Sequence, residues 1–174
     1  MEINQAGLEL VKKAENDNDP KSGYRCVGGI VSYVPYIDEV GVCTIGIGSI
    51  MYENGTKVSM NDPEISEPRA FGLLQWELKS KAATIEAWAN NHGIVLNENQ
   101  FSALNSLAYN LGAGVITDTG RSMNAALLSK DPDQIKTAFM MYVKGYTSVF
   151  GIRVGKTLPG LVTRRQAEIN LYFS

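Results

Sequence analysis

Residue types that build common metal and nucleophile sites are scarce in this 174-residue chain. It has one histidine, His92, and two cysteines, Cys26 and Cys43, which lie far apart in the sequence. A zinc site takes three or four clustered ligands, so these residues do not predict one. His92 lies in the turn-like stretch 90–93, and neither cysteine sits in a nucleophile motif, which argues against a Ser–His–Asp or Cys–His triad. We therefore expect no metal and no cofactor.

Extended apolar segments and a strong net charge are missing as well. No run approaches about 18 apolar residues, so the sequence predicts no membrane insertion. Residues 1–13 are amphipathic and do not resemble a signal peptide. Sixteen Lys and Arg against eighteen Asp and Glu give a net charge of −2, which excludes a chain built to coat nucleic acid. Residues 121–174 alone carry eight basic and three acidic residues, so they either attract an anionic partner or form a solvated helix face.

The length fits one domain, residues 1–174, that buries a core without a metal or disulfide. Pairing of Cys26 with Cys43 stays open, because they flank a segment rich in Gly, Tyr and Val, whereas a cytosolic chain would keep them reduced.

Helix and strand signals predict an α+β fold. Apolar spacing and caps indicate helices at 4–15, 66–88, 97–111 and 122–128, from Asp131 or Asp133 to about 143, and from 159 onward, with Gly112 and Gly114 ending the third. The β region, about 24–62, has a strand broken by Pro35, a hairpin with a glycine-rich second strand over 42–48, an Asn54-Gly55 turn and a third short strand at 56–62. We expect this small lobe to pack against a larger helical lobe, 66–174 plus helix 4–15, with an active-site cleft between them.

Three acidic residues lie nearest that lobe boundary. Glu15 ends the first helix, and Asp38 and Glu39 lie at the turn of the hairpin. Two carboxylates across a cleft are the minimal machinery of a glycosidase, one donating a proton and the other activating water or attacking directly. The alternative is that they only keep the surface soluble, as most Asp and Glu residues do.

Four segments share a pattern with a known family. The hairpin reads Tyr-Ile-Asp-Glu-Val-Gly-Val-Cys-Thr-Ile-Gly-Ile-Gly over 36–48, and the other segments are 8–15, 96–112 and Leu-Pro-Gly-Leu-Val-Thr-Arg-Arg-Gln-Ala-Glu over 158–168. In this order they resemble the phage-type lysozymes, glycoside hydrolase family 24. The resemblance implies a lysozyme-like fold and a muramidase.

The resemblance also implies roles for matched positions. Glu15 would be the general acid, Asp38 would position or deprotonate the attacking water, and the Thr44 hydroxyl would hold that water. The family is regarded as inverting, which needs carboxyl groups about 6.5–9.5 Å apart. Tyr109 and Asn110 match positions that line the saccharide cleft. The alternatives are purely structural: Thr44 would be an ordinary strand residue, and Tyr109 would belong to the core.

The implied substrate is the β-1,4 link between N-acetylmuramic acid and N-acetylglucosamine in peptidoglycan glycan strands. We expect a monomer that is made in the cytoplasm without a signal peptide and reaches the periplasmic wall with a holin or a secretion apparatus. It would be a phage endolysin or a delivered antibacterial toxin, and an inhibitor protein is a further partner this setting allows. The alternative is a non-catalytic peptidoglycan-binding protein. A lytic transglycosylase is a third hypothesis, which Asp38 and Thr44 argue against.

The chain also departs from the family pattern. Asn16 replaces the glycine that usually follows the glutamate, and Ser49 replaces a histidine after the hairpin glycines. An insertion, about 17–34, separates Glu15 from Asp38 and could cap the cleft, extend the sheet or bind a partner. The Arg164-Arg165 pair either caps acidic groups or touches substrate.

Overall fold

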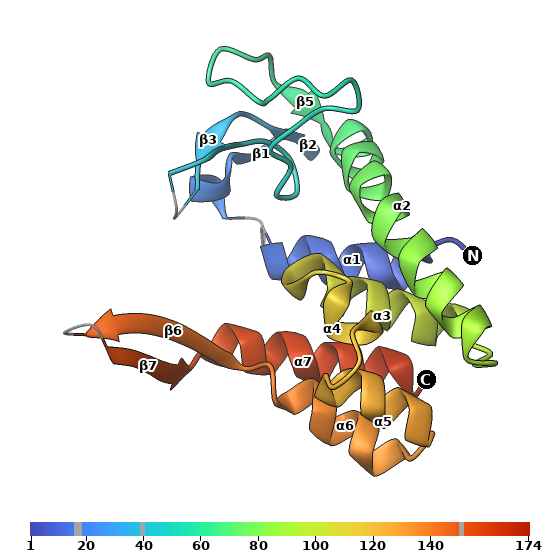
Figure 1. Ribbon diagram of the computed structural model, residues 1–174. Coiled ribbons are helices and arrows are strands. Elements are labelled where there is room, and N and C mark those ends of the chain that lie inside the picture. The colour runs from blue at the N-terminus through green and yellow to red at the C-terminus, as the bar shows by residue number, and fades with distance from the viewer. Residues whose placement is uncertain (16–18, 39–40, 150–151) are drawn as a thin grey trace. The chain divides into compact units, whose positions relative to one another are not determined.

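The computed structural model describes residues 1–15, 19–38, 41–149 and 152–174 (Figure 1). The helices are α1 (Gln5–Glu15), the 3-10 helix η1 (Pro20–Ser22), α2 (Glu67–Asn91), α3 (Glu98–Leu111), α4 (Gly114–Thr117), α5 (Ser122–Ser129), α6 (Pro132–Met140) and α7 (Pro159–Tyr172). The strands are β1 (Tyr24–Val27), β2 (Ile30–Tyr33), β3 (Tyr36–Ile37), β4 (Cys43–Thr44), β5 (Ile65–Ser66), β6 (Lys144–Val149) and β7 (Ile152–Thr157). No helix in these described ranges has the length and apolarity needed to cross a lipid bilayer.

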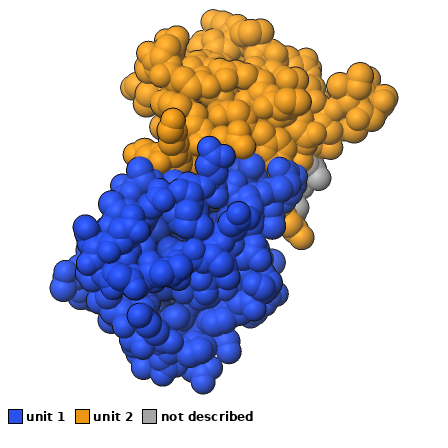
Figure 2. Space-filling view, turned by 90° about the vertical axis from the view of Figure 1, so that its right-hand side faces the viewer, with its two compact units in different colours: residues 1–10, 81–174 blue, residues 11–80 orange. Residues whose placement is uncertain are grey.

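The chain divides into two compact units, coloured separately in Figure 2. Unit 1 contains residues 1–10 and 81–174, and unit 2 contains residues 11–80. The divisions fall inside α1 and α2, so each of these helices supplies residues to both units.

Unit 1 is built around α3, which packs against α7 and α4, while α6 packs against both α5 and α7. Phe101, Leu104 and Leu107 of α3 are fully buried in its hydrophobic core. A capping box opens α3: the Asn97 side chain accepts from the Gln100 backbone N–H, and the Gln100 side chain accepts from the Asn97 backbone N–H. Satisfying these amides at the first turn fixes where the helix begins.

Other helix ends in unit 1 settle open points of the sequence analysis. The Asn4 side chain accepts from the Gly7 N–H and caps α1, which agrees with the predicted start of this helix near residue 4. Asp131, and not Asp133, caps α6, accepting from two backbone N–H groups. Gly112 ends α3 by donating to the Ala108 carbonyl, but Gly114 begins α4 instead of ending a helix.

Unit 2 carries an antiparallel sheet in the order β1–β2–β5 and a separate β3–β4 pair. The predicted third strand at 56–62 is wrong, because the third strand is β5, which pairs with β2. Residues 51 and 57 form only an isolated bridge beside the Asn54-Gly55 turn, where Gly55 has a φ of +82°. Such short pairings leave too little alternation to locate a strand from sequence.

The glycine-rich second strand of the hairpin is also shorter than predicted. Only Cys43 and Thr44 pair as a strand. Gly46 and Gly48 then adopt φ values of +65° and +82°, and Ile45 and Ser49 exchange two backbone hydrogen bonds. Glycine is the residue that takes these left-handed conformations without strain, so these glycines turn the chain back on itself.

The β6–β7 hairpin of unit 1 is not predicted by the sequence, which indicates no element between the helix that ends near residue 143 and the one that begins at residue 159. Its strands pair from Lys144 with Thr157 to Val149 with Ile152, and β7 leads into α7 (Figure 1). Tyr, Thr, Val and Ile in these strands are the strand-forming residues that mark such a hairpin. The open question of a disulfide is answered as well, since Cys26 and Cys43 are both free thiols.

Candidate active site

Glu15 is the last residue of α1 and is half-buried. Its helix is anchored within unit 2 by Val11, which is buried, and by Lys12. The Lys12 ammonium forms an ion pair with Glu67 at the start of α2 and lies 5.4 Å from the centre of the Phe71 ring. These contacts hold the C-terminal turn of α1, and with it the Glu15 backbone, against α2.

Asp38 is held at the end of β3 by a closed set of hydrogen bonds. Its backbone N–H donates to the Val42 carbonyl over 2.9 Å, and the Val42 N–H donates to Asp38 Oδ1 over 2.8 Å. Gly41, at a φ of +85°, donates its N–H to the Asp38 carbonyl. The Val42 N–H therefore holds the carboxylate through Oδ1. The second acidic residue of this turn, Glu39, lies outside the described residues, as does Asn16.

Thr44 lies directly opposite Tyr36 in the β3–β4 pair. Directly opposite residues share one face of a sheet, and Asp38, two residues after Tyr36, follows on the same side. Thr44 is 2% exposed, and its hydroxyl donates to the Val42 carbonyl over 3.1 Å. A hydroxyl has a single proton, so Thr44 keeps only acceptor capacity for a further partner.

Tyr36 connects the two carboxylates that the sequence analysis singled out. Burial raises the pKa of this phenol, and the negative charges of Glu15 and Asp38 raise it further, to about 12. Charge effects decline with distance, so the phenol lies within electrostatic range of both carboxylates. Tyr36 therefore keeps its proton at neutral pH.

Tyr109 and Asn110, the predicted saccharide contacts, lie at the end of α3 in unit 1, whereas Glu15, Asp38 and Thr44 all lie in unit 2. Both side chains are half-buried. The Lys81 ammonium lies 5.3 Å from the centre of the Tyr109 ring, within cation–π range. The Asn110 side-chain oxygen accepts a hydrogen bond from Arg165 over 3.0 Å.

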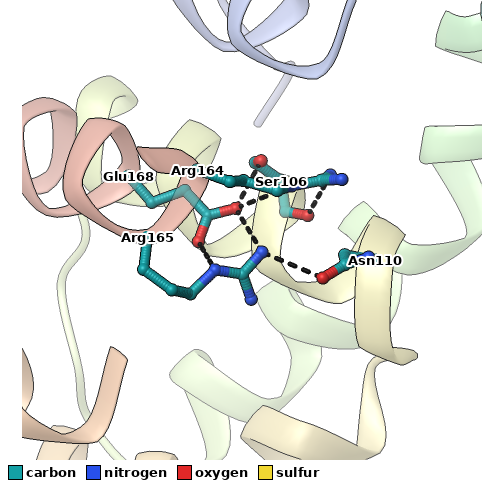
Figure 3. Close-up of polar contacts among 5 residues, drawn as sticks. All are labelled: Ser106, Asn110, Arg164, Arg165 and Glu168. Carbon is teal, nitrogen blue, oxygen red and sulfur yellow. Dashed lines mark hydrogen bonds and ion pairs between the residues drawn. The ribbon is translucent and has the colours of Figure 1, made fainter. Parts of the chain in front are cut away.

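A buried polar cluster surrounds that last contact (Figure 3). Glu168 is completely buried and forms ion pairs with Arg165, over 2.9 Å, and Arg164, over 3.3 Å. Its Oε1 also accepts from the Ser106 hydroxyl over 2.7 Å. Burial raises the pKa of Glu168, while Arg165, Ser106 and Arg164 oppose that rise. The arginine pair thus satisfies a buried acid, which is one of the two roles considered for it.

The phage lysozyme family profile matches residues 28–168, most of the chain. The chain belongs to the phage lysozyme family. Similar solved structures confirm the α+β, lysozyme-like fold. An endolysin from Escherichia coli O157:H7 phage FAHEc1 gives a TM-score of 0.76 at 24% identity, covering 100% of this chain and 94% of that one. A variant of P22 lysozyme gives 0.72 at 25% identity, covering 100% and 99%.

Among curated proteins, this member of the phage lysozyme family is similar to the endolysin of Lactococcus phage c2. The two are 28% identical over 173 residues, which is 99% of this chain. The chain spans 60% of the length of that relative.

The sequence does not predict the roles of two residues at this site. Tyr36 is recognisable only as part of the hairpin motif, although the Tyr-x-Asp spacing places both side chains on one side of a strand. Glu168 is recognisable only as part of the segment 158–168. Its signal was the spacing of three and four residues from Arg165 and Arg164, which puts all three side chains on one helix face.

Proposed function

We propose that this chain is a peptidoglycan hydrolase, a muramidase that cleaves the β-1,4 bond between N-acetylmuramic acid and N-acetylglucosamine with inversion. Its membership of the phage lysozyme family supports the reaction class. The observation that carries the site assignment is the β3–β4 pair, where Thr44 lies opposite Tyr36 and Asp38 follows, held by the Val42 N–H. The charges of Glu15 and Asp38 both raise the pKa of the Tyr36 phenol, which supports the same assignment. Acid–base hydrolysis of a glycosidic bond needs two carboxylates.

Glu15 is the general acid in this proposal and protonates the glycosidic oxygen as the leaving sugar departs. Asp38 accepts a proton from the attacking water on the opposite face of the sugar ring. Tyr36 supports both roles, because a phenol that keeps its proton can donate a hydrogen bond to whichever carboxylate is ionised.

Thr44 orients the water. Because its own proton is engaged by the Val42 carbonyl, Thr44 can only accept from the water. A water that donates one hydrogen to Thr44 and the other to Asp38 keeps its lone pairs for the anomeric carbon. If Thr44 donated instead, it would occupy one of those lone pairs and weaken the nucleophile.

Tyr109 and Asn110 bind the glycan in this proposal, the first through its ring and the second through its amide. Peptidoglycan glycan strands are the partner, and the chain acts on them as a monomer and as one domain. We propose that it works on the cell wall after release by a holin or delivery by a secretion apparatus.

The decisive experiment identifies the fragments released from purified peptidoglycan by mass spectrometry. We expect the wild type to release reducing N-acetylmuramic acid ends and Glu15→Gln to release none, because an amide cannot donate the acidic proton. Glu9→Gln is the matched control, an exposed glutamate on the same helix that should keep full activity. Asp38→Asn retains an oxygen for the Val42 N–H, so its hairpin should persist while most activity is lost.

Other outcomes point elsewhere. Fragments with anhydro ends would indicate a lytic transglycosylase. A wild type that sediments with the wall but releases no fragments would favour the non-catalytic binding protein. Full activity in Glu15→Gln would mean that another residue is the acid.

A further inference from the structure

Asn110 is the last residue in a series of side-chain contacts that begins with buried residues of α7. Arg165 is completely buried, and its Nη2 donates to Asn110 Oδ1 over 3.0 Å, across 55 residues of sequence (Figure 3). Asn110 itself is only half-buried, in the last turn of α3. The completely buried Arg165 side chain therefore holds the oxygen of the Asn110 amide, which is only half-buried.

Arg165 cannot turn away from Asn110 without breaking its other contacts. Its Nε lies 2.9 Å from Glu168 Oε2, and its Nη2 donates to Glu168 Oε1 over 3.2 Å. Glu168 is fixed in turn by the Ser106 hydroxyl and by Arg164. Charge-assisted and forked contacts of this kind define the plane of the guanidinium group.

The chemistry of arginine dictates how the Asn110 amide is oriented. A guanidinium group carries donors only, so the amide atom that faces it must be the oxygen. The amide nitrogen then points away from Arg165. Within the ranges that the structure describes, this nitrogen has no hydrogen-bond acceptor, although it carries two protons.

We infer that Arg165 and Glu168 are positioning residues, which lock the Asn110 amide so that it presents N–H donors to the glycan and selects an acceptor oxygen of the saccharide. The inference rests on the proposed function, because it takes Asn110 as a glycan contact. Amino sugars offer the carbonyl oxygen of the N-acetyl group and hydroxyl oxygens as acceptors. A locked donor favours these groups over an N–H or an ammonium group.

The first test changes the donor without disturbing the lock. Asn110→Asp keeps an oxygen for Arg165 but replaces the outward NH2 with a second oxygen. We expect the dissociation constant for soluble, uncrosslinked peptidoglycan glycan strands, measured by calorimetry, to rise about tenfold or more. The melting temperature should stay the same or increase, since Arg165 gains a charged partner. An unchanged dissociation constant would overturn the inference.

Asn170→Asp is the matched control. Asn170 lies on the exposed side of α7, and its Oδ1 accepts from Gln166 Nε2 over 3.0 Å, so the same change again leaves the accepting oxygen in place. Its glycan affinity should equal that of the wild type. A loss as large as that of Asn110→Asp would show that added negative charge alone causes the effect, and it would also overturn the inference.

A second test asks whether Arg165 does the positioning. Arg165→Met combined with Glu168→Gln removes one charge of each sign, and the glutamine keeps an oxygen for Ser106 and Arg164, so a cooperative melting transition should remain. In this background the amide can rotate, and adding Asn110→Asp should weaken binding less than it does in the wild type. An equal loss of glycan affinity from Asn110→Asp in both backgrounds would show that Arg165 does not orient the Asn110 amide.

Chemically N-deacetylated glycan strands identify the acceptor. If Asn110 donates to the acetyl carbonyl, the penalty of Asn110→Asp disappears on these strands, and if it donates to a hydroxyl, the penalty persists; both results support the inference. Failure of the proposed function can be distinguished from failure of this inference. A wild type that binds glycan strands but releases no reducing ends contradicts the muramidase proposal, while the dissociation constants of the variants can still be compared.

Discussion

Two arginine–carboxylate ion pairs, one in each unit, lie in opposite environments. In unit 1, Arg164, Arg165 and Glu168 are buried together and surround one another with hydrogen bonds. In unit 2, the bidentate pair of Arg69 with Glu53 leaves 44% and 36% of the two side chains exposed. The charges of the buried pair are therefore screened much less than those of the exposed pair.

This difference separates two ways of shaping a site. Buried charges fix geometry because breaking one contact leaves another charge unpaired, so unit 1 can hold Asn110 rigidly. The carboxylates proposed for chemistry are in unit 2, where Asp38 and Tyr36 lie at short strands closed by backbone hydrogen bonds and glycine turns. For Asp38, backbone hydrogen bonds and the turn at Gly41 set the position, whereas the Lys12–Glu67 ion pair helps to hold the helix that carries Glu15.

The largest expected effect comes from breaking the buried network. Glu168→Ala should lower the free energy of unfolding by about 3–5 kcal/mol, because it leaves buried arginines without their carboxylate. Glu53→Ala should cost less than about 1 kcal/mol, as exposed ion pairs do. Urea denaturation of both variants measures the difference. Equal losses would mean that burial does not distinguish the two pairs.

The range of each contact explains what could be predicted from the sequence. The capping box of Asn97 and Gln100 and the Asn54-Gly55 turn are made by residues within four positions, so local patterns reveal them. The bond from Ser106 to Glu168 spans 62 residues. Helical periodicity says that both face a core, but not which helices meet there.

The candidate site divides in the same way. Glu15, Asp38 and Thr44 could be proposed because they sit in short, recognisable segments. The orientation of Asn110 could not, since it depends on Arg165 in a distant helix. The third strand of the sheet was misplaced because β5 has two residues and pairs with β2 across more than thirty positions. Local sequence patterns therefore identify candidate catalytic residues more readily than they identify the distant residues that position a side chain.

The next effect in size tests the role of backbone turns in unit 2. Gly23 has a φ of +72°, and a Cβ there would lie 2.1 Å from the Val34 carbonyl oxygen and 3.0 Å from the Tyr36 ring. We expect Gly23→Ala to destabilise the protein by more than the roughly 1–2 kcal/mol that a left-handed φ alone costs. It should also reduce wall lysis, because Tyr36 must shift.

Gly29→Ala is the control for Gly23→Ala. Gly29 has a φ of +81° with open space around the position of a Cβ, so it suffers the conformational cost without the clash. Thermal unfolding and lysis assays of the two variants separate these causes. If Gly29→Ala impaired lysis equally, Tyr36 would not depend on the turn at Gly23.

A smaller, pH-dependent effect belongs to the exposed pair of unit 2. The hydrogen bond from Arg69 lowers the pKa of Glu53 to about 2. A lowered native pKa stabilises the fold above the unfolded value of 4.5, and this contribution is lost as the pH falls from 4.5 toward 2. The stability difference between wild type and Glu53→Gln should stay below about 1 kcal/mol at pH 6 and vanish near pH 2, as followed by urea denaturation. A difference that persists at pH 2 would contradict the ion pair as its source.

The smallest effect is expected for Ser49→Ala in unit 2, with Ser102→Ala in unit 1 as its comparison. Ser49 in unit 2 and Ser102 in unit 1 are both completely buried. The Ser102 hydroxyl accepts from the Asn4 N–H over 3.0 Å, whereas the Ser49 hydroxyl has no partner in the described part of the chain. Ser102→Ala should therefore cost about 1–3 kcal/mol by orphaning an amide, and Ser49→Ala should be neutral or stabilise by up to about 1 kcal/mol. Calorimetric melting of the two variants reads the sign directly. Equal destabilisation of both variants would mean that the Ser49 hydroxyl is as well hydrogen-bonded as the Ser102 hydroxyl. The difference between the two units would then hold for their arginine–carboxylate pairs but not for their buried hydroxyl groups.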